Sequence, residues 1–295
     1  MSEGDEIPEL RLAPRESSDD LAQRVEREQR RRDDSRALEM ENSLAPFRVG
    51  SVPYLNSVPL TRGLENEVLF MPPSELAVEL AEDRLDAALV SITEVLFRDR
   101  YDILDSIAVA SLGEVYSVFL AHRIPLAKVS EVWCDPASLT SVNLLKVLMG
   151  ERGQQIEFLK LDDYGDAASK DAVMLIGNPA IEFRRAQPDH ETWDLGAAWH
   201  EMTGLPFVFA VWALRRDVEN ERLRAQLREA RDFGMDTLDH IIDHRSDYDR
   251  DFRKDYLGWH IHFHLGADEK RGVARFVELL EKHSGETVFP PKYVA

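Results

Sequence analysis

The chain has 295 residues, enough for two ordinary domains, and its 44% hydrophobic content can supply a core for each. Its 36 Lys and Arg residues and 55 Asp and Glu residues give a formal net charge of -19. This charge argues against a nucleic-acid partner, because the phosphates would be repelled. An anionic ligand would need a site that is attractive locally, against the overall field.

The cysteine content and the first residues indicate the compartment. Cys134 is the only cysteine, so no intramolecular disulfide can form, and its place at a predicted strand end favours a packing role over a nucleophile. The start of the chain is neither basic nor apolar, so no signal peptide is predicted, and no apolar segment approaches the length of a membrane span. We expect a cytoplasmic protein with no membrane partner; the sequence carries no signal for an oligomeric state.

Residues 1–45 differ in composition from the rest of the chain. Glu, Asp and Arg dominate them, so a disordered or solvated helical extension is predicted. From residue 46 strands and helices alternate, which favours an α/β fold with mostly parallel sheets. The predicted strands are 47–52, 85–90, 115–121, 131–134, 172–176, 207–214 and 259–265. The predicted helices are 60–64, one with Ser74 as its N-cap, one opening at Ser91, 140–149, one opening at Gly177, 217–242 and 267–283.

The almost unbroken apolar run 207–214 is typical of a strand buried on both faces. Together with 115–121, it is predicted to carry the chain from one domain to another and back. This gives a discontinuous α/β domain of 46–115 plus 210–295 and an inserted α/β domain of 116–209. A ligand would then bind in the cleft between the two domains.

Polar residues follow the first predicted strand, where α/β sheets bind their ligands. Tyr54, Asn56 and Ser57 lie in this loop, and Asn56 offers both an amide donor and an acceptor. Asn56 could instead cap the short helix that follows, and the residues alone leave both roles open.

Hydroxyl groups occur at two predicted helix starts. Ser91 and Glu94 have the spacing of a capping box, and that helix would point its N-terminus at the cleft. Ser138, Thr140 and Ser141 precede another helix, where hydroxyls and free N–H groups together favour a carboxylate site over simple capping.

Three histidines alternate at 260, 262 and 264, so on the predicted strand they would share one face. No supporting carboxylate is evident in the sequence and no HExxH helix exists, so a solvated strand face is favoured and no metal site is predicted. The chain has no P-loop and no Gly-x-Gly-x-x-Gly motif, so no nucleotide and no other cofactor is expected.

Two motifs carry a family resemblance: SVPYLNSVPL at 51–60 and TGLPFVFAVW at 203–212. Across 46–295 the chain resembles the MqnA family, the chorismate dehydratases of the futalosine route to menaquinone. The resemblance implies a two-domain fold like the type II periplasmic binding proteins, with the active site in the interdomain cleft. It implies a hydro-lyase that converts chorismate, a small dicarboxylate, to 3-[(1-carboxyvinyl)oxy]benzoate and water.

The resemblance also assigns residues. It implies that Asn56 and Ser117 are catalytic and that the hydroxyl cluster at 138–141 binds substrate. It further implies that the enolpyruvyl carboxylate of the substrate acts as the base. Asn178 stands where the family usually has Asp, so a substrate contact there would use an amide instead of a charge.

Two alternatives remain at this stage. One is an MqnD-like 1,4-dihydroxy-6-naphthoate synthase, which shares the fold and is expected to place a histidine in the cleft; His122 is the histidine nearest to a crossover strand. The other is a non-enzymatic organic-acid-binding protein, against which the expected absence of a signal peptide argues.

Overall fold

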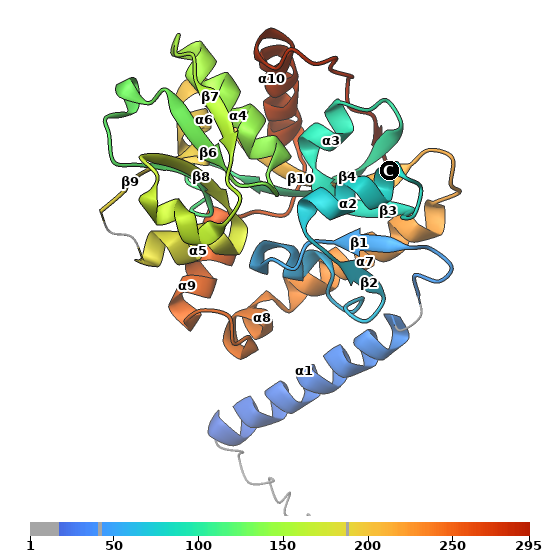
Figure 1. The fold of residues 1–295 in the computed structure, drawn as a ribbon. Coiled ribbons are helices and arrows are strands. Elements are labelled where there is room, and N and C mark those ends of the chain that lie inside the picture. Colours follow the sequence, from blue (N-terminus) through green and yellow to red (C-terminus); the bar gives the residue numbers. More distant parts are fainter. Residues whose placement is uncertain (1–17, 41–42, 187–188) are drawn as a thin grey trace, which may run out of the picture.

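The computed structural model describes residues 18–40, 43–186 and 189–295, which form two β-sheets surrounded by helices (Figure 1). The first sheet has the strand order β11-β4-β10-β3-β1-β2 and the second has the order β7-β6-β8-β5-β9. The first sheet comprises β1 (Val49–Ser51), β2 (Val68–Phe70), β3 (Ala87–Ser91), β4 (Tyr101–Ser111), β10 (Phe207–Arg215) and β11 (Tyr293–Val294). The second comprises β5 (Val118–His122), β6 (Glu131–Cys134), β7 (Glu157–Lys160), β8 (Ala172–Ile176) and β9 (Glu191–Asp194).

Helices surround these sheets, and the first of them lies apart from both (Figure 1). They are α1 (Ser18–Met40), α2 (Pro73–Ala81), α3 (Ile92–Leu96), α4 (Leu139–Glu151), α5 (Gly177–Ala186), α6 (Leu195–Thr203), α7 (Glu221–Asp236), α8 (Leu238–His244), α9 (Arg250–Asp255) and α10 (Ala267–His283). Shorter turns are the 3-10 helices η1 (Leu55–Leu60), η2 (Leu126–Lys128) and η3 (Tyr164–Ser169) and the π-helical turn η4 (Tyr256–His260).

Both sheets are mostly parallel, as the sequence predicts, but each contains one strand that runs against all the others. Strand β10 runs antiparallel to β3 and β4, and β5 runs antiparallel to β8 and β9. The chain forms β5 and β10 directly after it passes from one sheet to the other. Each of these strands runs antiparallel to both of its neighbours. The remaining pairs, such as β1 with β3 and β6 with β8, are parallel.

The chain passes between the sheets twice. It leaves the first sheet after Ser111 and enters the second at Val118, and it returns to the first sheet at Phe207. We propose the two sheets as the cores of two domains, with the inserted domain spanning the residues between these crossings. Strand β10 belongs to the first sheet along its whole length.

Several predicted elements are misplaced, for identifiable reasons. The first short helix is at Leu55–Leu60 and not at 60–64, and Ser74 lies inside α2, whose N-cap is Pro72. The predicted strand 259–265 is absent, because the chain there continues from α9 into the π-helical turn η4. The predicted helix 217–242 is two helices, α7 and α8.

The longest strand, β4, was not predicted at all. Its apolar pattern is interrupted by Asp105 and Ser106, and Ser106 has a φ of +71°. The pattern on each side is too short to indicate an eleven-residue strand by itself.

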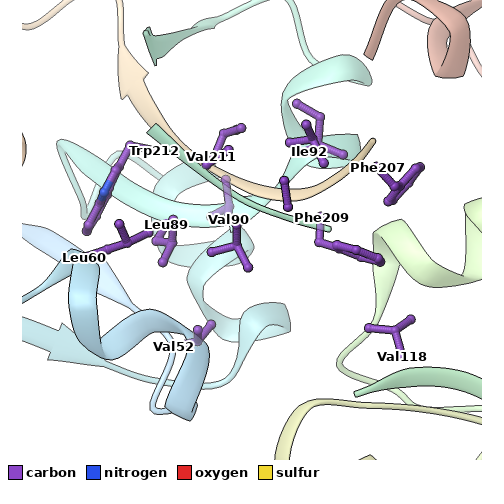
Figure 2. Close-up of a cluster of buried hydrophobic side chains, with 14 of the residues drawn as sticks. Val52, Leu60, Leu89, Val90, Ile92, Val118, Phe207, Phe209, Val211 and Trp212 are labelled. Carbon is purple, nitrogen blue, oxygen red and sulfur yellow. The ribbon is translucent and has the colours of Figure 1, made fainter. Parts of the chain in front are cut away.

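The strand β10 is buried on both faces, as its sequence predicts. Val211 and Trp212 have no exposed surface, and they lie beside Leu89 and Val90 of β3 (Figure 2). This packing fixes the centre of the first sheet, and with it the strand ends that border the cleft.

Helix α1 lies apart from both sheets (Figure 1). It is mostly exposed, and Arg36 near its end pairs with Glu229 at 2.7 Å and Asp236 at 2.9 Å on α7. Residues 1–17 of the predicted extension lie outside the described residues. No helix in the described part of the chain is both long and apolar enough to cross a membrane.

Candidate active-site cleft

A cavity lies where the two sheets face each other, and residues from both sheets line it. Its lining includes Tyr54, Asn56, Ser91 and Phe209 from the first sheet and its loops, and Ser117, Ser138, Thr140, Ser141 and Gly177 from the second. None of the described lining residues is Asp, Glu, His, Lys, Arg or Cys.

The two residues predicted to be catalytic meet at a third residue, Tyr256. The hydroxyl oxygens of Ser117 and Tyr256 are 2.7 Å apart, and the Asn56 side chain also interacts with the Tyr256 hydroxyl and lowers its pKa. Tyr256 is buried, and burial raises its pKa well above the usual value, so the hydroxyl stays protonated at neutral pH. Asn56 and Ser117 come from opposite sides of the cleft, and Tyr256 fixes their relative position.

The turn that presents Asn56 is held by its neighbour. The Ser57 hydroxyl donates to the carbonyl oxygens of Val52 at 2.6 Å and Tyr54 at 2.8 Å. Ser57 is buried and does not line the cavity, so these bonds give it a structural role, and its predicted substrate contact stays a prediction. The N-cap of η1 is Tyr54, so capping does not account for Asn56.

Ser117 follows a constrained segment at the first crossing between the sheets. The Asp194 carboxylate accepts the backbone N–H groups of Val115 at 3.1 Å, Tyr116 at 2.8 Å and Ala197 at 3.0 Å. Tyr116 has a φ of +68°, which is uncommon for a residue with a large side chain. Such a conformation persists only where the surroundings impose it, and Asp194 supplies that restraint.

The starts of α3 and α4 meet through their hydroxyl groups. The Thr140 hydroxyl oxygen lies 2.7 Å from that of Thr93 and also hydrogen-bonds the Ser91 hydroxyl. Ser91 is the N-cap of α3 but makes no side-chain capping bond, and Glu94 pairs with Arg98 at 2.5 Å. The predicted capping box is therefore wrong; Ser91 lines the cavity, and its hydroxyl bonds those of Thr93 and Thr140 instead.

Ser138 differs from the other hydroxyl residues at this end of the cleft. It is the N-cap of α4 but makes no side-chain capping bond, and its buried hydroxyl has no hydrogen-bond partner. Ser138 and Ser141 both line the cavity beside the free N–H groups of the first turn of α4. An unpaired buried hydroxyl costs free energy, so this position favours a bound acceptor.

The start of α5 also borders the cavity, at Gly177. Its φ is +59°, and an added Cβ would lie 3.0 Å from the Tyr54 ring, so glycine is required here. The next residue, Asn178, does not itself line the cavity, and its buried Oδ1 has no partner, so its predicted substrate contact stays a prediction.

The local electrostatics differ from those of the whole chain. The N-termini of α4 and α5 border the cavity and carry partial positive charge, which can attract an anion despite the net charge of -19. The nearby Asp135 carboxylate is buried and accepts from the Ala137 N–H and the Tyr164 hydroxyl, each at 2.9 Å. Burial raises the pKa of Asp135 and raises that of Tyr54 to about 12.

No histidine lines this cavity in the described residues. His122 pairs with Ala172 at one end of the β5–β8 ladder, whereas Val118 and Ile176 at the other end line the cavity. Cys134 is buried, which raises its pKa to about 12 and leaves it unreactive, as its predicted packing role requires.

The two mixed sheets and the cleft between them define a periplasmic-binding-protein-like fold. A solved protein from Archaeoglobus fulgidus matches 80% of this chain and 97% of its own, with a TM-score of 0.66 at 17% identity. The periplasmic aliphatic sulphonate binding protein SsuA from Escherichia coli matches 84% of this chain and 93% of its own, with a TM-score of 0.55 at 14% identity. These likenesses establish the fold class.

The family follows from sequence comparison. The chain belongs to the menaquinone biosynthesis family, whose model matches residues 47–282. It is 33% identical over 260 residues to a chorismate dehydratase from Thermus thermophilus, covering 80% of this chain and 96% of that protein. It is also 33% identical over 159 residues to a chorismate dehydratase from Campylobacter jejuni, covering 53% of this chain and 58% of that protein.

Proposed function

We propose that the protein is an enzyme, a carbon–oxygen lyase that converts chorismate to 3-[(1-carboxyvinyl)oxy]benzoate and water. The observation that carries this proposal is the placement of Asn56 and Ser117 on one Tyr256 hydroxyl at the wall of the cavity. The cavity also offers the anion-attracting start of α4 to a dicarboxylate. The similarity to two chorismate dehydratases supports the same function.

The reaction suits a site without charged side chains. One ring C–H bond and one ring C–O bond break, the proton and the hydroxyl leave as water, and the ring becomes aromatic. Aromatisation supplies a large driving force, so the protein has to fix the conformation of the substrate, bind its carboxylates and assist the departing hydroxyl. The described lining offers no histidine or carboxylate as a base, which is consistent with the substrate's own enolpyruvyl carboxylate taking the proton.

We assign roles by position. The Ser138 hydroxyl and the first N–H groups of α4 bind one carboxylate. Asn56 and Ser117 contact the end of the ring from which the hydroxyl departs. Tyr256 holds these two side chains in register and acts as a positioning residue.

The test is incubation of the purified protein with chorismate, with chromatographic detection of the benzoate product. We expect product formation, and a His122→Ala variant serves as a matched control that retains full turnover. Folded protein that binds chorismate and releases it unchanged would favour an organic-acid-binding protein. Turnover of cyclic dehypoxanthine futalosine that depends on His122 would favour the dihydroxynaphthoate synthase.

A further inference from the structure

Two histidines of the segment between η4 and α10 converge on one glutamate of α10. His262 Nε2 and His264 Nε2 lie 3.2 Å and 3.3 Å from the same oxygen, Glu269 Oε1. The two imidazole rings stack with their centroids 4.4 Å apart. Among the described residues, this is the one group of three His, Cys, Asp or Glu side chains whose ligand atoms lie close enough to share a metal ion. His260, the third histidine of the alternating set, lies elsewhere, beside the Glu114 carbonyl.

The short contacts in this cluster are not good hydrogen bonds. His262 Nε2 is buried and has no hydrogen-bond partner of acceptable geometry, although Glu269 Oε1 is within 3.2 Å. Glu269 is itself buried, and its other oxygen, Oε2, accepts the Gly266 N–H at 2.8 Å. That bond turns Oε1 toward the histidines and leaves three potential ligand atoms around one point.

We propose that His262, His264 and Glu269 bind a zinc ion. Zn–N and Zn–O bonds of roughly 2.0–2.2 Å in a tetrahedron place neighbouring ligand atoms about 3.3–3.5 Å apart. The two observed nitrogen–oxygen separations are close to this spacing. Two histidines and one carboxylate are a common zinc ligand set, and the exposed side of His264 leaves the fourth position to water.

The position of the cluster indicates what the ion would do. His262 exchanges backbone hydrogen bonds with Ala110 of β4, at 2.9 Å and 3.0 Å. Its neighbour Ile261 lines the cavity, whereas His262 and His264 do not. The ion would therefore lie outside the cavity and tie the segment that follows Tyr256 to the start of α10. Zinc sites with three protein ligands and a water are usually catalytic, but this one lies outside the cavity, so we assign it a structural role, independent of the function proposed above.

The test uses the full chain without a histidine tag, stripped of metal with a chelator and titrated with zinc chloride at neutral pH. We expect calorimetry to give one zinc per chain with a micromolar or tighter dissociation constant, and zinc to raise the melting temperature. His264→Ala and Glu269→Gln should each weaken binding by more than the roughly 10–100-fold that loss of an outer-shell partner causes. Gln at 269 keeps an acceptor for the Gly266 N–H, so folding should be retained.

A second histidine pair provides the matched control. The His240 and His244 rings on α8 also stack, with centroids 4.1 Å apart, but no third ligand from the described part of the chain completes that group. His244→Ala should bind zinc with the wild-type stoichiometry and affinity. Absence of micromolar binding, or binding that persists in His264→Ala and is lost in His244→Ala, would overturn the proposal.

Discussion

The two polar clusters of the cleft are built in different ways. Around Tyr256, a buried phenol is shared by Asn56 and Ser117, which come from distant parts of the chain. At the starts of α3 and α4, hydroxyl groups bond mainly to one another, and the Ser138 hydroxyl is left without a partner. The difference suggests that the first cluster is ordered before substrate arrives, whereas the second keeps one donor free for it.

Replacing Asn56 should have the largest effect on the first cluster. If its amide acts on the reacting end, Asn56→Ala should lower kcat by roughly 10²–10³, by analogy with the loss of an oxyanion-hole donor. Product affinity should fall much less, because the lost contact is strongest in the transition state. Chorismate turnover and product binding, measured on the same variant, test this. Normal turnover would remove Asn56 from the catalytic residues.

Tyr256→Phe tests whether the positioning of Asn56 and Ser117 by Tyr256 contributes to turnover. The ring keeps its stacking on Phe252, at 5.5 Å, but the hydroxyl that joins Asn56 and Ser117 is lost. We expect kcat to fall between roughly 10- and 100-fold from the misplacement of the two side chains. Stability should fall by about 1 kcal/mol, because the buried Ser117 hydroxyl loses its partner.

Tyr101→Phe is the matched control for that change. Tyr101 is also fully buried, but its hydroxyl has no partner and it does not line the cavity. Its removal should leave turnover unchanged and stability equal or slightly higher. Equal kinetic losses in the two variants would mean that Tyr256 acts only through packing.

Substitutions at Ser138 and Thr140 compare the loss of an unpaired hydroxyl with the loss of a hydrogen-bonded one. Ser138→Ala should raise KM roughly tenfold, the equivalent of about 1.5 kcal/mol for a hydrogen bond to a carboxylate, with little change in melting temperature. Thr140→Val breaks bonds to Thr93 and Ser91, so it should lower stability by about 1 kcal/mol or more. If Ser138 were only a helix cap, its variant would instead lose stability at an unchanged KM.

The smallest effect is expected from pH. Burial raises the pKa of Tyr54 to about 12 and raises that of Tyr256 as well, so both hydroxyls stay protonated at neutral pH. Among the described residues, Tyr54 is the one ionisable side chain that lines the cavity. We therefore expect kcat to be nearly constant from about pH 6 to about pH 9. A titration with a midpoint near 6.5 would instead indicate a catalytic histidine.

The sequence predicted single side chains better than the contacts among them. The YLNS motif drew attention to Asn56, and three hydroxyls near one helix start drew attention to Ser138. The turn-holding role of Ser57 was not predictable, because only the backbone path shows which acceptors its hydroxyl reaches. Tyr256 was missed because a tyrosine in an amphipathic stretch is typical of a core residue, and the π-helical turn has no recognisable period.

The fold was predictable in class, but the reversed direction of β5 and β10 was not. Local apolar patterns locate β6, β8 and β10, but pairing is decided by contacts between distant segments. The sequence does contain a signal for Glu269, the partner of His262 and His264. Glu269 stands three residues after Gly266, at the N3 position of α10, where a glutamate reaches back toward the residues before the helix.

The central claim is that a dicarboxylate binds between the two clusters. A crystal structure of the chain with the benzoate product tests it most directly. We predict one carboxylate within hydrogen-bond distance of the Ser138 hydroxyl and the first N–H groups of α4, with the ring between this carboxylate and Asn56. A product bound outside the cavity, or bound inside it with Ser138 and Asn56 untouched, would contradict the account.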